Sequence, residues 1–156
     1  MVNVTIRHQR SRNRSGCARV GPGGRRPRTG EPMESRSNAP AVLVVEEETH
    51  QREAIVSHLE AAGFSALGVE STDEALGLLR ARTILALVTD AHLPGPMDGF
   101  ELAQTARERF ADLPVVMMSG HSDASSGALP EGAAFVAKPY LLEHLVPTLR
   151  RMTGVR

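Results

Sequence analysis

The sequence predicts an α/β fold: a doubly wound, five-stranded parallel sheet with helices on both faces. Over residues 41–156, apolar β-branched runs alternate with stretches whose apolar residues recur at helical spacing. Several of these runs are continuously apolar, which is typical of strands buried on both faces. Alternating strands and helices form a parallel sheet, and right-handed crossovers leave few topologies. We expect the folded domain to span residues 40–154.

Five runs are expected to be strands. The runs that begin at Ala41, Ile84 and Pro114 are strongly apolar, whereas the run that begins at Ser65 is weaker. The expected strands span residues 41–45, 65–70, 84–89, 114–118 and 133–137.

Five stretches are expected to be helices, one of them short or irregular, and local signals place several of their ends. Gly63 should end the first helix, residues 71–74 form a capping box for the second, and Asp98 should cap the third. Residues 120–132 carry Ser, Gly and Pro130, so we expect a short or irregular fourth helix of one or two turns there. The other helices are expected over residues 49–62, 72–81, 99–110 and 140–152.

The N-terminal segment differs sharply in charge from the rest of the chain. Residues 1–40 contain nine Arg and two Glu, a net charge of +7, whereas residues 41–156 carry a net charge of −7. A basic segment rich in Gly, Pro and Ser has little to bury, so we expect residues 1–39 to be a disordered tail. Such a tail binds nucleic acid or an acidic partner, is simply solvated, or reflects an overlong gene prediction with the true start at Met33. No aromatic residue lies among the arginines and no pattern repeats, which favours the last two interpretations and argues against a nucleic-acid partner.

Composition also limits the cellular compartment and the classes of cofactor. No apolar run approaches the roughly 18–20 residues of a membrane span, and the N-terminus lacks the apolar stretch of a secretory signal. The single cysteine, Cys17, excludes an internal disulfide and a multi-cysteine metal site. We therefore expect a cytoplasmic protein with no membrane contact.

Polar residues follow the expected strands at the points where the strands end. Residues 46–48, all Glu, come after the first strand, and Asp90 comes after the third. Ser119 follows the fourth strand, and Lys138, the only lysine in the chain, follows the fifth. Ligands of doubly wound sheets bind beyond the carboxyl ends of the strands. We therefore expect carboxylates, a hydroxyl and an ammonium group to meet at one edge of the sheet.

This set of groups is suited to phosphoryl transfer. Carboxylates within about 4–6 Å raise one another's pKa, and a hard divalent cation such as Mg²⁺ relieves their repulsion. One carboxylate can then attack phosphorus and give an aspartyl phosphate. Lys138 can balance the new charge, the Ser119 hydroxyl can hydrogen-bond a phosphoryl oxygen, and Gly120 leaves room for the donor.

The motifs that carry these residues resemble the receiver domain of bacterial response regulators. The resemblance rests on AVLVVEEE at 41–48, LVTDAHLPGPMDGFELA at 87–103, PVVMMSG at 114–120 and AAFVAKPY at 133–140, and it covers about residues 41–153. It implies a flavodoxin-like sheet with strand order 2-1-3-4-5. The chain also resembles a single-domain subgroup known from alphaproteobacteria, with SG after strand four and a short, Pro-rich fourth helix.

The resemblance implies a role for each residue of the metal site. Asp90 would be the phosphoacceptor and would share Mg²⁺ or Mn²⁺ with Glu46, Glu47 and the backbone carbonyl of His92. Glu47 takes the place of the direct metal ligand. The family usually has Asp at that position, and the extra methylene of Glu alters a site in which magnesium requires near-octahedral geometry.

The resemblance also implies a switch and a pocket rim. Ser119 and Phe135 would be the switch residues, although packing in the core is an equally good interpretation of Phe135. His92, Gly120 and His121 would form the rim of the pocket, and we hypothesise that the two histidines tune the lifetime of the phosphoryl group. Pro139 would hold the bend after Lys138.

We predict a single-domain response regulator that accepts a phosphoryl group from a histidine kinase or a phosphotransfer protein. The chain ends within a few residues of the last expected helix, so we expect either output through protein–protein contact or a shuttle or phosphate sink in a relay, by a monomer or a weak phosphorylation-dependent dimer. The chemistry is self-directed, so we do not expect an enzyme.

Three other functions are alternatives, with unequal support from the sequence. The first is a phosphorylation-independent docking module whose metal site is impaired by Glu47. A phosphatase with an aspartyl nucleophile is disfavoured, since such enzymes carry Asp-x-Asp after the first strand. A flavin-binding domain is disfavoured because no Ser/Thr-rich phosphate loop follows that strand.

Overall fold

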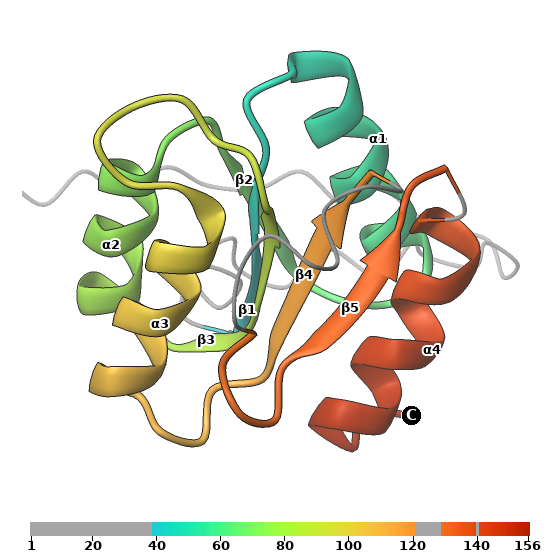
Figure 1. The fold of residues 1–156 in the computed structure, drawn as a ribbon. Helices are drawn as coiled ribbons and strands as arrows, with labels where there is room; N and C mark the ends of the chain where they lie inside the picture. Colours follow the sequence, from blue (N-terminus) through green and yellow to red (C-terminus); the bar gives the residue numbers. More distant parts are fainter. Residues whose placement is uncertain (1–38, 121–128, 140) are drawn as a thin grey trace, which may run out of the picture. The chain divides into compact units, whose positions relative to one another are not determined.

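Five strands form one parallel sheet in the order β2-β1-β3-β4-β5 (Figure 1). This computed structural model describes residues 39–120, 129–139 and 141–156, all within one compact unit of the chain. The predicted flavodoxin-like order is therefore confirmed. The strands are β1 (Ala41–Val45), β2 (Ala66–Val69), β3 (Ile84–Asp90), β4 (Val115–Ser119) and β5 (Ala134–Ala137).

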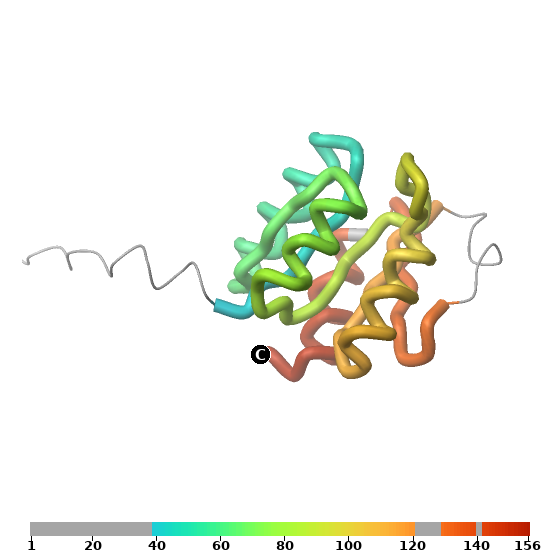
Figure 2. The backbone as a smooth tube through the Cα atoms, turned by 90° about the vertical axis from the view of Figure 1, so that its left-hand side faces the viewer, coloured from blue at the N-terminus to red at the C-terminus, as the bar shows by residue number. Residues whose placement is uncertain are grey.

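The four α-helices of the described residues cover both faces of the sheet. α2 and α3 lie on one face, in front of the sheet in Figure 2, and α1 and α4 lie on the other. The helices are α1 (Thr49–Ala61), α2 (Thr72–Ala81), α3 (Gly99–Arg109) and α4 (Leu141–Thr153).

Local signals end and begin the helices as the sequence predicts. Gly63 follows α1 with φ +93°, a conformation that glycine adopts without strain. The Ser71 side chain accepts a hydrogen bond from the Glu74 N–H at the start of α2. Asp98 and Glu101 form a complete capping box at the start of α3. These caps fix where the connecting loops leave the sheet.

Two apolar cores lie on opposite faces of the sheet, because successive side chains of a strand point to opposite faces. In β1, Val42 and Val44 pack under α1 and α4, whereas Leu43 and Val45 pack under α2 and α3. All of these strand residues are buried, as the continuous apolar run at residues 41–45 predicts.

One part of the expected helix pattern was wrong. In the first helix Ala54 recurs at helical spacing with the apolar residues Ile55 and Leu59, which predicts that it lies on the apolar face, but Ala54 is exposed. Ile55 and Leu59 are buried, and Val56 packs at the margin of the core. The reason is that the helix turns Arg52 and Val56 toward β2 at Gly68, where there is no side chain in the way.

β3 and β4 each extend one residue further than expected. Asp90 pairs with Met118 in the ladder between β3 and β4. Ser119 pairs with Ala137 in the ladder between β4 and β5. Asp90 and Ser119 therefore belong to the sheet, and pairing with the neighbouring strands fixes their backbones.

Some predictions lie outside the described residues. They include the tail of residues 1–38, most of the irregular fourth helix (residues 121–128), His121, and Tyr140 as the first residue of the last helix. Among the helices that the structure describes, none is long and apolar enough to cross a membrane.

Candidate functional site

The carboxyl ends of β1, β3 and β5 bring three charged side chains together. Lys138 Nζ donates to Asp90 Oδ2 at 2.6 Å and to Glu46 Oε2 at 3.2 Å. Asp90 is 8% exposed and Glu46 is 1% exposed, so both carboxylates are largely removed from water. The sheet topology therefore brings the two carboxylates and the ammonium group together, as expected from the positions of these residues at the ends of the strands.

Asp90 is held through both of its carboxylate oxygens. Oδ2 accepts from Lys138, and Oδ1 accepts from the backbone N–H of His92 at 2.9 Å. The adjoining backbone is fixed as well, because the Ala91 N–H donates to the Met118 carbonyl at 2.8 Å. The carboxylate therefore has a defined orientation at the end of β3.

The loop that follows Asp90 is closed by a backbone contact at Gly99. The Gly99 N–H donates to the Ala91 carbonyl at 3.1 Å. A Cβ at Gly99 would overlap the carbonyl oxygen of Asp90 and lie 2.8 Å from its carbonyl carbon. Only glycine fits here, so the start of α3 is pressed directly against the backbone of Asp90.

The loop that carries Glu46 is held mainly by side chains. Glu46 Oε1 accepts from the Glu48 N–H at 3.2 Å, and the Glu48 side chain in turn caps α1. The Arg52 guanidinium donates to the carbonyls of Glu46, at 2.8 Å, and Glu47, at 3.2 Å. The stem of Arg52 lies over Gly68, where a Cβ would be only 2.9 Å from Arg52 Cγ.

The electrostatics of the site follow from burial and from the shared ammonium. Burial raises the pKa of Glu46 and the Asp90 charge adds to this, although the Glu48 N–H and Lys138 oppose the rise. Burial lowers the pKa of Lys138, but its hydrogen bonds and charge interactions with Asp90 and Glu46 outweigh burial and raise that pKa overall. Lys138 is therefore a permanent cation between two carboxylates.

Ser119 and Lys138 are joined through the backbone. The Lys138 N–H donates to the Ser119 carbonyl at 2.8 Å, and the Lys138–Pro139 peptide bond is cis. Ser119 is buried at the end of β4, and Gly120 next to it is half-buried. The hydroxyl and the ammonium therefore come from adjacent strands at the same edge of the sheet.

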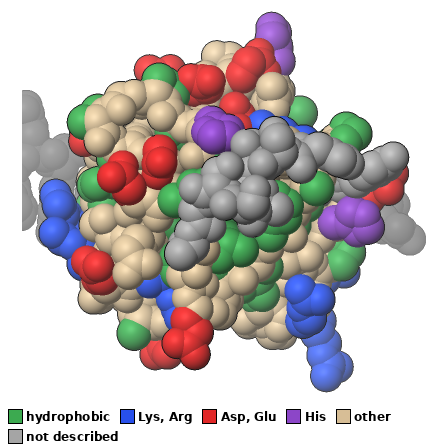
Figure 3. Space-filling model, in the orientation of Figure 1, with side chains coloured by type: hydrophobic (Ala, Val, Ile, Leu, Met, Phe, Trp, Pro, Cys, Tyr) green, Lys and Arg blue, Asp and Glu red, His purple; other side chains and the backbone are tan. Residues whose placement is uncertain are grey.

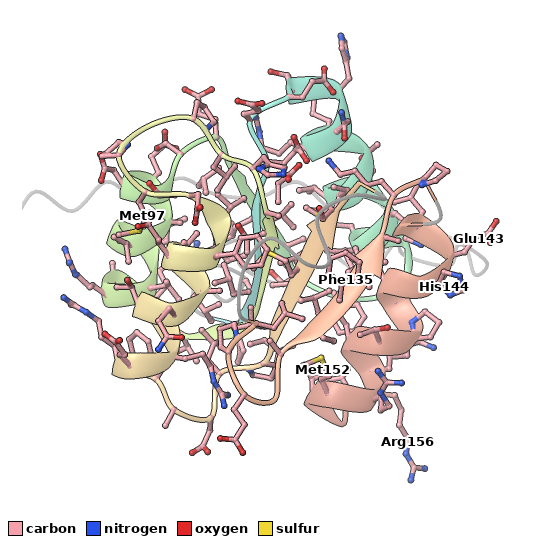
Figure 4. All side chains as sticks on the ribbon, in the orientation of Figure 1. Met97, Phe135, Glu143, His144, Met152 and Arg156 are labelled. Carbon is pink, nitrogen blue, oxygen red and sulfur yellow. The ribbon has the colours of Figure 1, made fainter. Side chains whose placement is uncertain are left out.

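Phe135 lies further back on β5, where it pairs with Met117 in the ladder. Its ring is half-buried and packs against the core under α2 and α3 (Figure 4). The structure therefore shows the packing contact. The switch role stays a prediction.

Glu47 and His92 differ in burial from the two buried carboxylates, Glu46 and Asp90. Both residues are exposed. Within the described part of the chain, no group of three or more His, Cys, Asp or Glu side chains stands ready for a metal ion. Of the three predicted carboxylates, the structure brings Glu46 and Asp90 together at Lys138 and leaves Glu47 exposed.

The donor chemistry nevertheless fits a hard cation. Glu46, Asp90 and the adjacent Glu47 offer carboxylate oxygens, and the His92 carbonyl lies in the loop after Asp90, so all the donors are oxygen atoms of the kind that Mg²⁺ prefers. Burial raises the pKa of Glu46 against the opposing effects of the Glu48 N–H and of Lys138. Figure 3 shows several acidic side chains in the upper part of the view, on the side where the strands end.

Three residues of this site were missed by the sequence analysis. Gln51 Oε1 accepts from Lys138 Nζ at 3.0 Å, and Arg52 and Gly68 hold the acidic loop. A glycine inside a strand often marks a close approach, so Gly68 carried a signal. Nothing in the helical pattern distinguished Gln51 or Arg52 from other polar residues on the surface of α1.

Comparison with known proteins decides the family. The family model of the response regulator receiver domain matches residues 42–150. The chain belongs to this family. Receiver domains of this kind are parts of bacterial two-component systems, and apart from Ala41 the motifs that predicted the family lie within the matched residues.

The chain is similar to longer regulators and to isolated receiver domains. It is 35% identical over 118 residues to the C4-dicarboxylate transport transcriptional regulatory protein DctD of Rhizobium meliloti, covering 74% of this chain and 25% of the relative. The crystal structure of a receiver protein from Sinorhizobium medicae matches with a TM-score of 0.68 and 28% identity, covering 75% of this chain and 96% of that one. The receiver domain of NtrX from Brucella abortus matches with a TM-score of 0.65 and 26% identity, covering 74% and 99%. The chain spans about a quarter of the length of the curated relatives that it matches.

Proposed function

We propose that Asp90 accepts a phosphoryl group from a phosphohistidine of a histidine kinase or of a phosphotransfer protein. The observation that carries the proposal is the Asp90 carboxylate itself, which is 8% exposed and bound by Lys138 and by the His92 N–H. A carboxylate that is oriented, reachable and paired with a permanent cation is equipped to act as a nucleophile and to carry added negative charge.

In the proposed step an Asp90 oxygen attacks phosphorus. The new O–P bond forms as the P–N bond to the donor imidazole breaks, and the imidazole leaves with the electron pair of that bond and takes up a proton. Lys138 balances the charge that reaches the site, and the Ser119 hydroxyl donates to a phosphoryl oxygen. The product is an acyl phosphate on this same chain, so we propose a phosphoacceptor and no turnover of a separate substrate.

Receiver domains bind Mg²⁺ at the site of phosphorylation. The residues that would hold the ion here are Asp90, Glu46, Glu47 and the His92 carbonyl. When bound, the ion supplies positive charge against which the carboxylates and the phosphoryl oxygens can approach each other. Lys138 holds the carboxylates of Asp90 and Glu46, whereas Glu47 is exposed.

The consequence of phosphorylation is proposed to be a changed contact with a protein partner. Ser119 and Phe135 lie on the adjacent strands β4 and β5, so a hydroxyl drawn toward the phosphoryl group and a ring packed beside it can bias one surface between two states. We also propose that His92, exposed beside Asp90, tunes the lifetime of the acyl phosphate together with His121, which lies outside the described residues. Replacing both histidines by Ala should change the rate of dephosphorylation, and an unchanged rate would exclude this role.

The test is incubation of the purified chain with acetyl phosphate and Mg²⁺, read by intact mass. A gain of one phosphoryl group that depends on Mg²⁺ and is absent from the Asp90→Asn variant supports the proposal. The Asp98→Asn variant is the matched control. Asp98 lies at the end of the loop that follows Asp90, and Asn caps helices about as well as Asp. Equal labelling of the Asp90→Asn variant and the wild type would place the phosphoryl group elsewhere.

One observation favours a second candidate, a receiver-like docking module that works without phosphorylation. Glu47 is exposed and stands outside the group formed by Glu46, Asp90 and Lys138. A Mg²⁺ titration followed by NMR distinguishes the candidates. No binding by the wild type, with binding restored by Glu47→Asp, would support the docking module, and binding by the wild type would support phosphoryl transfer.

A further inference from the structure

The ammonium group of Lys138 is shared among three acceptors, and one of them is neutral. Besides Asp90 Oδ2 and Glu46 Oε2, the Gln51 Oε1 atom accepts from Nζ at 3.0 Å. The ammonium has three N–H donors, so these three bonds use its full donor capacity. Gln51 is exposed, whereas Asp90 and Glu46 are buried at the carboxyl end of the sheet.

The position of Gln51 follows from the way α1 begins. Glu48 caps the helix and accepts from the Gln51 N–H at 2.8 Å, which fixes the backbone of Gln51 in the first turn. Lys138 is fixed independently by its own N–H bond to the Ser119 carbonyl. The contact between the two side chains therefore joins two separately anchored elements, α1 and the end of β5, across 87 positions of sequence.

The chemistry of the contact fixes the orientation of the amide. An ammonium group only donates, so the carbonyl oxygen of Gln51 must face Lys138, and the amide NH₂ group points elsewhere. A neutral acceptor holds the ammonium without cancelling its charge. A carboxylate in the same place would hold it as well, but it would add negative charge next to the group that receives a phosphoryl anion.

We propose that Gln51 is a positioning residue that holds the Lys138 ammonium at the mouth of the site while Asp90 takes up the phosphoryl group. The inference rests on the proposed function and deepens it. Transfer converts the Asp90 carboxylate into an acyl phosphate, in which the carboxyl group no longer carries its own negative charge, and this weakens its ion pair with Lys138. Glu46 would then draw the ammonium inward, and Gln51 counteracts that pull from the solvent side, so that Lys138 remains in reach of the phosphoryl oxygens.

The test exploits the presence of a single lysine in the chain. Protein labelled with lysine carrying ¹³C at Cε alone gives one side-chain signal, that of Lys138, whose mobility is measured by NMR relaxation before and after addition of acetyl phosphate and Mg²⁺. The variants are Gln51→Met, which keeps the length and removes the acceptor, and Gln51→Glu, which keeps the acceptor and adds charge. Gln104→Met is the matched control, an exposed glutamine on α3.

The expected result separates position from charge. In Gln51→Met the Lys138 signal becomes more mobile and phosphorylation slows by roughly threefold to tenfold, the effect of losing one partly exposed hydrogen bond to a charged group. In Gln51→Glu the signal regains the mobility of the wild type, while phosphorylation stays slower than in the wild type. In Gln104→Met neither quantity changes.

Two outcomes would overturn the inference. One is a Gln51→Met protein whose lysine mobility and rate match those of Gln104→Met. The other is slower phosphorylation with an unchanged lysine signal, because the effect would then not pass through Lys138. If the wild type takes up no phosphoryl group, the proposed function fails, and the lysine signal of the resting protein still decides whether Gln51 positions Lys138.

Discussion

Each of the two buried carboxylates lies next to a loop, Glu46 at the start of one and Asp90 at the strand end before the other, and the two loops are held in different ways. The loop between β1 and α1, residues 46–48, is held by the guanidinium of Arg52, whose stem lies over Gly68. The loop between β3 and α3, residues 91–98, is closed by the backbone of Gly99 pressed against the backbone of Asp90.

The difference determines how each loop responds to substitution. A long side chain such as that of Arg52 can shift by a few tenths of an ångström at small energetic cost, so contacts to its stem can relax. Two backbone segments within rigid elements cannot separate without moving a strand or a helix. Substitutions around Asp90 should therefore have larger effects than substitutions around Glu46.

The largest effect is expected for Gly99→Ala. The new Cβ would overlap the Asp90 carbonyl, so either α3 or the end of β3 must move, at a cost of about 3 kcal/mol in the free energy of unfolding. Urea denaturation measures this value, and phosphorylation by acetyl phosphate should fall with it. The control is Gly77→Ala in α2, where a Cβ meets nothing within 4 Å and should stabilise the protein by about 0.5–1 kcal/mol. Equal changes in the free energy of unfolding for Gly99→Ala and Gly77→Ala would mean that the backbone contact at Gly99 does not make the loop after Asp90 sensitive to substitution.

A smaller effect is expected for Arg52→Met. The variant keeps an apolar stem but loses the bonds to the carbonyls of Glu46 and Glu47, which should lower the free energy of unfolding by about 1–2 kcal/mol. Arg52→Lys should recover part of the loss, since an ammonium can donate but lacks the planar fork. Arg109→Met at an exposed position of α3 serves as the control, with a change within about 0.5 kcal/mol. A loss at Arg52 no greater than at Arg109 would mean that the guanidinium does not hold the loop.

Gly68→Ala is expected to have a smaller effect still, with a sign that depends on Arg52. The added Cβ would lie 2.9 Å from Arg52 Cγ and 3.1 Å from Val56 Cγ2, both side-chain atoms that can move. We expect a loss of about 0.5–1 kcal/mol, because crowding outweighs the better strand propensity of Ala. In an Arg52→Ala background the same substitution should become neutral or stabilising. A double-mutant cycle in urea measures the coupling, and additivity of the two changes would show that the stem of Arg52 does not rest on this position.

The two loops also differ in how far the sequence alone could predict them. Asp90 and Lys138 were found because the carboxyl ends of parallel strands must meet at one edge, whatever the details of the loops. Asp98 was found because a helix cap is a local pattern. These inferences need only the order of the elements and their ends.

The remaining parts of the site depend on how far individual side chains reach. Gln51 meets Lys138 across most of the chain, and Arg52 folds back onto carbonyls that precede its own helix. The exposure of Glu47 depends on the conformation of a three-residue loop, which spacing does not determine. Prediction of these features requires the backbone, because several rotamers of each side chain are compatible with the same sequence pattern.

The smallest effect, and the one that isolates the acidic loop, is the pH dependence of Glu46→Gln. Burial raises the pKa of Glu46 in the folded state above its ordinary value of 4.5. Ionisation of this group therefore costs stability, and the cost begins near the unfolded pKa and grows as the pH rises through the folded pKa. Because Gln does not ionise, the unfolding free energy of the variant minus that of the wild type should become more positive as the pH rises above 4.5. Urea denaturation at a series of pH values measures the difference, and Gln104→Met, which changes no titrating group, should give a difference that is flat with pH. If instead the difference in unfolding free energy falls as the pH rises, the ion pair with Lys138 outweighs burial at Glu46. The loop of residues 46–48 would then be held by charge as firmly as the loop of residues 91–98 is held by its backbone contact.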